Sequence, residues 1–215
     1  MKTMIAVPCM DSVPVQFCQS LALLDKVGEV TLAMKPGSLI YNSRNELAKM
    51  AIESGAEFVL WLDSDMVFPP DLLVRMSKTL LENGWDILTG IYFKRLPPFG
   101  PVLFDRVDQL PDGKLQADKT ETIPDFPWEV GGCGFGGVFM RTEVLMATAL
   151  DHGGKLFEPE NGAGEDIAFC IRARKSGYKV ICDPSIELGH VGHQVVTRDY
   201  YTALAAKGGQ DAGKS

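Results

Sequence analysis

The sequence predicts an α/β protein in which a mostly parallel sheet is flanked by helices. Apolar segments of strand length alternate three times with segments of helical periodicity over residues 4–84, and a fourth strand-like segment follows. Residues 58–62 are apolar without a break, which is typical of a central parallel strand covered on both faces. This order predicts a doubly wound sheet with right-handed crossovers.

The pattern begins with a strand, a helix and a second strand. Residues 4–7 form a short apolar run that stops at Pro8 and predict the first strand. A helix is expected over residues 14–25, and residues 30–34 predict the second strand. The helix has apolar residues at helical spacing, and its expected buried stripe is Val15, Cys18, Leu21 and Leu24.

Two further helix–strand units follow. Ser43 and Glu46 have the S-x-x-E spacing of a capping box, which predicts that a helix opens there and ends near Gly55. After the strand at 58–62, a helix is expected over 70–83 and then a strand over 86–92. The expected buried positions of the two helices are Leu47, Met50 and Ala51, and Leu73, Met76 and Leu80.

The pattern changes after Lys94. Residues 94–129 hold six of the thirteen prolines and few helical signals, with a hairpin expected to turn near 112–113. We interpret this segment as a small β-rich insertion that supplies active-site loops, because such loops commonly carry function on α/β scaffolds. A glycine-rich segment, 131–137, then leads to a short strand over 138–140.

The last part of the chain predicts two helices and a final strand. Thr142 is expected to cap a helix that ends near 150, a second helix covers 165–175, and the last strand covers 178–182. Residues 201–215 have too little apolar surface to fold alone and are expected to be a flexible tail. Residues 1–200 are therefore expected to form a single domain.

Composition excludes several classes of protein. The net charge of −7 argues against non-specific binding of nucleic acid, which needs a basic surface. Five cysteines, none in a close pair, fit a reduced, cytoplasmic setting. The first residues run directly into a strand without a signal sequence, and no apolar stretch approaches the length of a membrane span. Any lipid-linked acceptor would be reached from the membrane periphery.

Two carboxylates, Asp63 and Asp65, directly follow the apolar strand at 58–62, and Ser64 lies between them. Ligands of open α/β sheets bind beyond the carboxyl ends of the strands, so this motif is delivered to the expected site. Paired carboxylates suit Mg²⁺ or Mn²⁺ bridged to a diphosphate. The alternative is that both carboxylates only solvate a strand end.

Two of the three histidines, His190 and His193, lie together in a glycine-flanked loop after the last expected strand. Neutral imidazole is a suitable Mn²⁺ ligand beside carboxylates, and His190 is the stronger candidate. Glu165 and Asp166 stand at a helix start, where they complement the helix dipole. One of them could also take a proton from an attacking hydroxyl as a general base.

The glycine-rich segment matches G-x-G-x-x-G at Gly132, Gly134 and Gly137. A dinucleotide-binding fingerprint follows the first strand and opens a helix, whereas this run precedes a strand. We therefore reject a dinucleotide site. The glycines are expected to let the backbone approach a sugar or acceptor closely.

Several segments in order resemble the GT-A-fold glycosyltransferases, in particular the family-two type and its small phage or bacterial relatives. The resemblance runs from Ile5 to about Gly192, and it implies a Rossmann-like, mostly parallel sheet flanked by helices. It rests on seven segments, each weak alone. They are Ile5-Ala6-Val7-Pro8, Tyr41-Asn42-Ser43-Arg44-Asn45, Trp61-Leu62-Asp63-Ser64-Asp65, the 131–137 glycine run leading to Met140-Arg141, the segment from Gly164-Glu165-Asp166 to Arg174, Gly177-Tyr178-Lys179-Val180, and His190-Val191-Gly192.

The resemblance implies a role for each candidate residue. Pro8, Arg44 and Asn45 would line the nucleotide site; Asp63 and Ser64 would lie at the ribose, and Asp63 and Asp65 at the metal. His190 would complete the metal shell, and Asp166, with Glu165 beside it, would be the base. The expected activity is transfer of one sugar from a nucleotide-diphosphate sugar to a hydroxyl acceptor, with inversion. Met34-Lys35-Pro36 stands where many relatives have an acidic residue that reads the base.

Two alternatives remain open at this point. Asp63-Ser64-Asp65 could be the D-x-D of a haloacid-dehalogenase-type phosphatase, in which the first aspartate is a covalent nucleophile. That class expects the motif on its first strand. The chain could also be a non-catalytic relative of the transferase fold that binds a nucleotide or a glycan.

Overall fold

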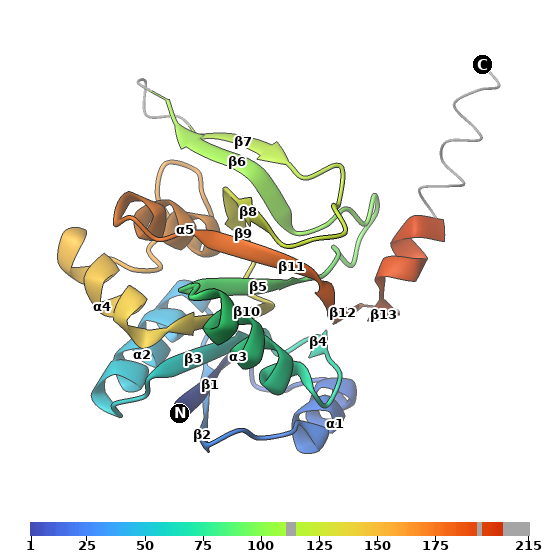
Figure 1. The fold of residues 1–215 in the computed structure, drawn as a ribbon, viewed down its shortest axis with the longest axis horizontal. Coiled ribbons are helices and arrows are strands. Elements are labelled where there is room, and N and C mark those ends of the chain that lie inside the picture. Colours follow the sequence, from blue (N-terminus) through green and yellow to red (C-terminus); the bar gives the residue numbers. More distant parts are fainter. Residues whose placement is uncertain (111–114, 193–194, 204–215) are drawn as a thin grey trace.

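A computed structural model describes residues 1–110, 115–192 and 195–203. Its centre is a seven-stranded sheet with strand order β2-β1-β3-β10-β5-β11-β8, and helices lie on both of its faces (Figure 1). The strands of this sheet are β1 (Lys2–Cys9), β2 (Glu29–Pro36), β3 (Phe58–Leu62), β5 (Ile87–Ile91), β8 (Trp128–Val130), β10 (Gly137–Arg141) and β11 (Val180–Glu187).

The sheet is mixed, as the strand directions show. Strands β2, β1 and β3 pair in parallel, and so do β5 and β11. The predicted mostly parallel α/β architecture is confirmed. Strand β10 inserts antiparallel between β3 and β5, a neighbour that the sequence pattern did not indicate. Its partners come from segments about 50 and 80 residues away, a pairing that periodicity cannot reveal.

The helices lie close to their expected positions. They are α1 (Val15–Leu23), α2 (Ile40–Glu53), α3 (Leu72–Asn83), α4 (Thr142–Asp151) and α5 (Glu165–Lys175). The stripe expected on α3 is confirmed, because Leu73, Met76 and Leu80 are fully buried. The stripe expected on α1 is only partly confirmed, since Leu24 is buried but Val15 is 74% exposed and Phe17 faces the core instead. On α2, Leu47 and Ala51 are buried as expected, whereas Met50 is exposed.

The two expected helix caps are also wrong. Helix α2 begins at Ile40, so Ser43 lies inside its first turn, and the N-cap residue Leu39 makes no capping side-chain hydrogen bond. Helix α4 begins at Thr142 itself, and the preceding Arg141 occupies the cap position. At α4 a tertiary contact takes the place of a capping side chain, because the backbone N–H of Thr142 donates to the carbonyl of Glu57. At α2 the backbone N–H of Ser43 donates to the carbonyl of Leu39 within the first turn.

Two small antiparallel sheets lie beside the central one. Strands β6 (Leu103–Gln109) and β7 (Leu115–Lys119) form the expected hairpin and extend to β9 (Gly132–Cys133), while the hairpin turn itself lies outside the described residues. The other sheet joins β4 (Met66–Val67), β12 (Gly189–Val191) and β13 (Val195–Val196). The strand expected to be the last at 178–182 is therefore followed by two more, and it extends to Glu187.

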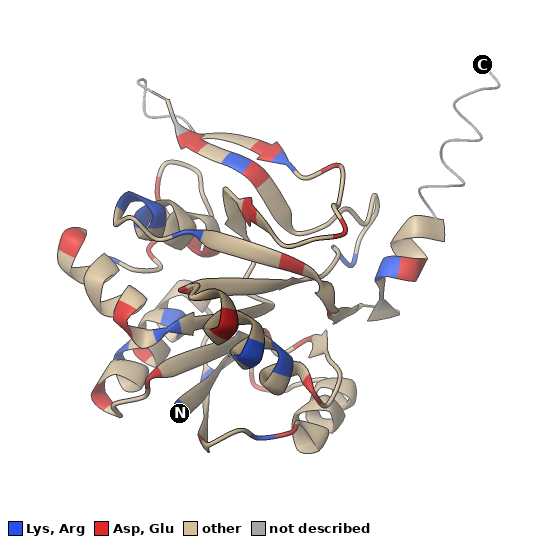
Figure 2. Cartoon of the chain, viewed as in Figure 1, with Lys and Arg blue, Asp and Glu red and all other residues tan. Residues whose placement is uncertain are grey.

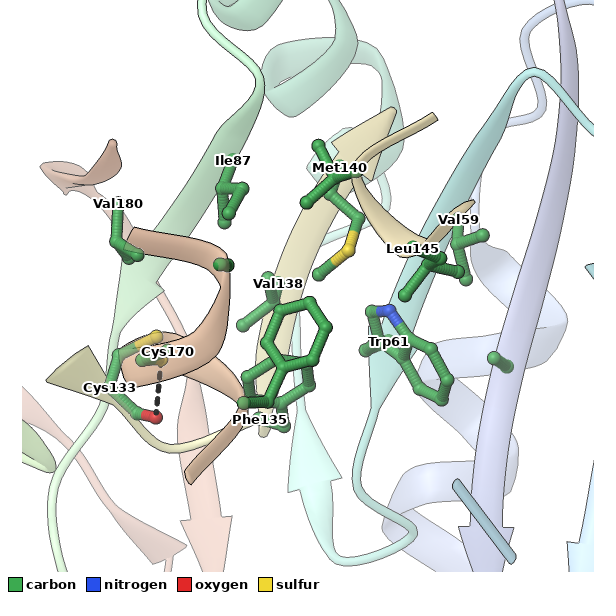
Figure 3. Packing of buried hydrophobic residues seen from close by; sticks show 14 of the residues in the cluster. Val59, Trp61, Ile87, Cys133, Phe135, Val138, Met140, Leu145, Cys170 and Val180 are labelled. Carbon is green, nitrogen blue, oxygen red and sulfur yellow. Dashed lines mark hydrogen bonds between the residues drawn. The ribbon is translucent and has the colours of Figure 1, made fainter. Parts of the chain in front are cut away.

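One of the hydrophobic clusters packed against the central sheet is rich in aromatic rings. Trp61, Phe135, Phe157 and Phe169 are fully buried, and the rings of Phe157 and Phe169 stack at 4.7 Å (Figure 3 shows Trp61 and Phe135). Three of the cysteines, Cys133, Cys170 and Cys182, are buried free thiols in this region. They behave as small apolar residues, as the sequence predicted.

The glycine-rich segment serves packing within the protein. A Cβ on Gly134 would lie 2.0 Å from the Tyr92 hydroxyl oxygen, and one on Gly137 would lie 2.7 Å from a methyl of Leu188. The expectation that these glycines make room for a sugar is replaced by this closer cause. Glycine is therefore required at Gly134, before β10, where the chain passes Tyr92, and at Gly137, the first residue of β10, where it passes Leu188.

Charged residues of both signs are spread over the surface (Figure 2). A basic group ends α5, where Arg172, Arg174 and Lys175 complement the helix dipole. Among the described residues, no helix combines the length and apolar character needed to cross a membrane.

Candidate active site

A pocket of about 340 Å³ lies at the carboxyl ends of β1 and β3. This is the position at which open α/β sheets bind ligands. The pocket walls come from five parts of the chain that are far apart in sequence. They are Pro8, Cys9 and Met10; Gly37, Ser38, Ile40 and Ser43; Asp63, Ser64 and Asp65; Arg95; and His190.

The small β4–β12 pairing brings the histidine to the carboxylates. The chain turns after β3 through a hydrogen bond from the N–H of Met66 to the carbonyl of Asp63 (3.2 Å). Strand β12 then pairs with β4, so that His190 lies opposite Met66, and the N–H of Val191 donates to the carbonyl of Asp65 (2.8 Å). A backbone hydrogen bond thus joins two residues, Val191 and Asp65, that are 126 positions apart (191 − 65).

Asp65 is the meeting point of two basic side chains. Its Oδ2 lies 3.2 Å from Nε2 of His190 and accepts a hydrogen bond from Nη1 of Arg95 at 2.8 Å. Burial alone would raise the pKa of Asp65, but His190 and Arg95 outweigh it, and the pKa lies below its usual range. The carboxylate is therefore ionised at neutral pH.

A backbone carbonyl from a distant segment orients the ring of His190. Its Nδ1 lies 2.9 Å from the carbonyl oxygen of Phe93, which can only accept, so Nδ1 carries a proton. Nε2 is then left to face the carboxylate of Asp65. Burial would lower the pKa of His190, but hydrogen bonding and charge from Asp65 raise it above its usual value. A proton or a metal cation must lie between the two side chains.

Asp63 is held by a buried arginine. Nη2 of Arg44 donates to Oδ1 of Asp63 at 2.7 Å, and Nε of Arg44 lies 3.5 Å from Oε1 of Glu165. The guanidinium is only 1% exposed and lies 5.2 Å from the ring centre of Phe135. Burial would lower the pKa of Arg44, but the carboxylates around it raise the pKa instead.

Asp166 lies beside this cluster at the start of α5. Burial, followed by the charges of Glu165 and Asp63, raises the pKa of Asp166 to about 6. The N–H of Ile167 donates to its Oδ1 at 2.7 Å and opposes that rise. A carboxyl with this pKa can both accept and release a proton near neutral pH.

Most of the residues predicted from the sequence meet in this region. Pro8, Ser64, Asp63, Asp65 and His190 line the pocket. Arg44, Glu165 and Asp166 lie behind Asp63, joined to it through Arg44. His193 lies outside the described residues.

Asn45 is placed elsewhere. It donates to Oε1 of Glu158 at 2.9 Å and accepts from the N–H of Phe157 at 3.1 Å. These bonds tie α2 to the loop that carries the Phe157 ring, 6.0 Å from the guanidinium of Arg44. Asn45 therefore helps to hold the buried residues behind the site in place. It is not one of the described residues that line the pocket.

The donor atoms for a cation are an oxygen of Asp65 and an imidazole nitrogen of His190. Mn²⁺ accepts both types of donor, and Oδ2 of Asp65 already faces Nε2 of His190 at 3.2 Å. Asp63 is turned to Arg44, and the described residues hold no cluster of three such side chains placed to bind a metal. The residues fit a cation that takes its remaining ligands from a bound substrate.

Sequence reasoning missed Arg95 and Tyr92. The sequence pattern places Arg95 at the start of the 94–129 insertion. Its position just beyond the end of a strand is a signal that could have identified it as a pocket residue. Tyr92 is buried against His190, with ring centres 5.7 Å apart, and its hydroxyl accepts from the N–H of Gly136. Burial raises the pKa of Tyr92 well above its usual value, so it stays neutral. No local pattern distinguishes it from a core tyrosine.

Comparison with known structures identifies the class of fold. The chain resembles A197 from STIV, with a TM-score of 0.65 and 20% identity over 93% of this chain and 92% of that one. It also resembles GalNAc-T7, solved with UDP, GalNAc and Mn²⁺, with a TM-score of 0.61 and 10% identity over 89% of this chain and 44% of that one.

A third match is S. aureus TarS 1-349, with a TM-score of 0.52 and 16% identity over 85% of this chain and 58% of that one. The chain therefore has a GT-A glycosyltransferase-like fold. It spans about half the length of the two larger matches. No protein-family model matches the chain, and no curated protein matches its sequence.

Proposed function

We propose that this chain is a metal-dependent glycosyltransferase that moves one sugar from a nucleotide-diphosphate sugar to a hydroxyl acceptor with inversion. One observation carries the proposal: on a GT-A-like fold, Oδ2 of Asp65 and Nε2 of His190 face each other across 3.2 Å in the pocket beyond β3. The charge of Asp63, which lines the same pocket, contributes to the raised pKa of Asp166.

Each side chain has a distinct part in this reaction. Asp65 and His190 would hold a divalent cation, which stabilises the negative charge that develops on a leaving diphosphate. The carbonyl of Phe93 keeps the proton of His190 on Nδ1, so that Nε2 is the metal-facing atom. Arg44 fixes the position of Asp63 at the pocket wall, where Asp63 would contact the ribose.

Asp166 is proposed as the general base. A raised pKa of about 6 makes it a stronger base than an ordinary aspartate while it remains ionised at pH 7.5. It sits at the rigid start of α5, which suits accurate placement against an acceptor hydroxyl. Glu165 is committed to Arg44 and therefore serves mainly to hold the cluster together.

The phosphatase alternative is disfavoured by the environment of its would-be nucleophile. Asp63 is in a 2.7 Å ion pair with a buried guanidinium, which lowers its reactivity toward a phosphate ester. The motif also follows β3, with β1 and β2 before it. The non-catalytic alternative predicts nucleotide binding without turnover, and the turnover experiment described below separates it from transfer.

The test is a thermal-shift screen of UDP, GDP, ADP, CDP and dTDP with and without Mn²⁺. A ligand that binds only the folded state raises the melting temperature, so a Mn²⁺-dependent shift with one base would name the donor nucleotide. The Asp65→Ala variant should lose this shift and retain the fold, and Asp25→Ala, which removes an exposed carboxylate elsewhere, should keep it. A full Mn²⁺-dependent response from Asp65→Ala would contradict the proposal.

Once the donor nucleotide is known, turnover is tested with the matching nucleotide sugar. Hydrolysis or transfer that requires Mn²⁺ would support catalysis, whereas binding alone would favour the non-catalytic alternative. NMR of the product anomer then tests inversion. Retained anomeric configuration would contradict that part of the proposal.

A further inference from the structure

Arg95 contacts the same oxygen that a cation would use. Its Nη1 lies 2.8 Å from Oδ2 of Asp65, and Nε2 of His190 lies 3.2 Å from that same Oδ2. A divalent cation held between Asp65 and His190 would take its oxygen ligand from this atom. The guanidinium and the cation therefore compete for the same carboxylate oxygen, and their like charges repel each other.

The position of Arg95 allows it to leave. Its side chain is 53% exposed, whereas that of Arg44, which holds the other aspartate, is 1% exposed. Exposed ion pairs of a long, flexible side chain contribute little to stability and exchange readily with solvent. Arg95 also lines the pocket together with Asp65, so the released guanidinium stays close to any ligand that enters.

We propose that Arg95 is a built-in counter-cation of Asp65, which keeps the divalent cation bound weakly until a diphosphate enters and offers Arg95 a new anionic partner. The inference rests on the proposed metal site of the transferase. Guanidinium groups pair well with phosphate oxygens as well as with carboxylates, so the side chain exchanges one anion for another. The metal and the diphosphate are thereby loaded together.

The first measurement is the affinity for Mn²⁺ alone. The EPR signal of free Mn²⁺ reports how much of the ion is bound. Arg95→Ala should bind Mn²⁺ more tightly than the unsubstituted protein, by about two- to fivefold, which is the range of an exposed ion pair. The matched control is Lys94→Ala, which removes the same charge one residue away. Lys94 is not among the described residues lining the pocket, and this variant should bind as the unsubstituted protein does.

The second measurement adds inorganic pyrophosphate as the probe. Pyrophosphate should tighten Mn²⁺ binding by a larger factor in the unsubstituted protein than in Arg95→Ala, because only the former has a guanidinium to transfer. A residue with a merely structural role would not reverse its effect between the two measurements. Arg95→Lys, which keeps a point charge without the planar fork, should lie between them.

The outcomes separate this inference from the proposed function. Equal Mn²⁺ affinity in Arg95→Ala and the unsubstituted protein would overturn the role of Arg95 and leave the metal site standing. If Lys94→Ala increased the Mn²⁺ affinity as much as Arg95→Ala does, the role of Arg95 would also be overturned, because the change in net charge would then explain the effect. Absence of Mn²⁺ binding in every form would overturn both the metal site and this inference.

Discussion

Asp63 and Asp65 differ by two positions in sequence and lie in contrasting environments. Asp63 pairs with Arg44, which is buried under Phe135 and also reaches Glu165. Asp65 pairs with the exposed Arg95 and with His190. A buried pair cannot be separated without leaving a charge uncompensated, whereas an exposed pair separates at little cost. One aspartate is thus part of the frame, and the other is available to a ligand.

The largest expected effect comes from breaking the buried pair. Arg44→Met should lower the free energy of unfolding by about 3 kcal/mol, because the carboxylates of Asp63, Glu165 and Asp166 lose their common cation. Chemical denaturation measures this loss. A variant with the unfolding midpoint of the unsubstituted protein would show that the Asp63 side of the site is not a rigid frame.

Asp166 should make the free energy of unfolding depend on pH. Its pKa of about 6 lies above the ordinary value, so the folded state binds its proton more tightly than the unfolded state does. Its contribution to stability is full below the unfolded pKa and is lost as pH rises through about 6. Asp166→Asn should therefore be more stable at pH 7.5, by on the order of 1–3 kcal/mol.

Denaturation at pH 4.5 and 7.5 checks this prediction. The difference in stability between Asp166→Asn and the unsubstituted protein should grow with pH. Transfer by this variant should be lost at both values. An activity profile that does not fall below pH 6 in the unsubstituted protein would argue against Asp166 as the base.

Asn45 should give a smaller effect. Asn45→Ala removes the hydrogen bonds to Glu158 and to the N–H of Phe157, and should cost about 1–2 kcal/mol of stability. Since Asn45 does not line the pocket, the affinity for nucleoside diphosphate should change little. A selective loss of nucleotide binding with unchanged stability would return Asn45 to the nucleotide site.

The smallest change in stability is expected from the exposed pair. Arg95→Ala should alter the free energy of unfolding by no more than about 0.5 kcal/mol, measured by the same denaturation. Its effect should instead appear in Mn²⁺ affinity. A destabilisation comparable to that of Arg44→Met would make the two aspartates equivalent and remove the contrast between them.

The sequence predicted most of the elements because their signals are local. The unbroken run of β3 and the stripe of α3 are visible in any short window, and both are confirmed. The cap at Thr142 failed because its backbone N–H bonds to the carbonyl of the distant Glu57, and the cap at Ser43 failed because α2 already begins at Ile40. The α1 stripe failed at Val15 because Val15 and Phe17 are both apolar, and only the packing of Phe17 against Phe68 decides which of them is buried.

The candidate residues were found by their types and by their places at strand ends. What they contact was not visible, because Arg44, Arg95 and His190 are respectively 19, 30 and 125 positions from the aspartates they meet. By itself the sequence determined that two carboxylates follow a buried strand. Only the tertiary structure decided which of them is buried with an arginine and which is open to a ligand, because burial and charge pairing depend on segments that local periodicity does not connect.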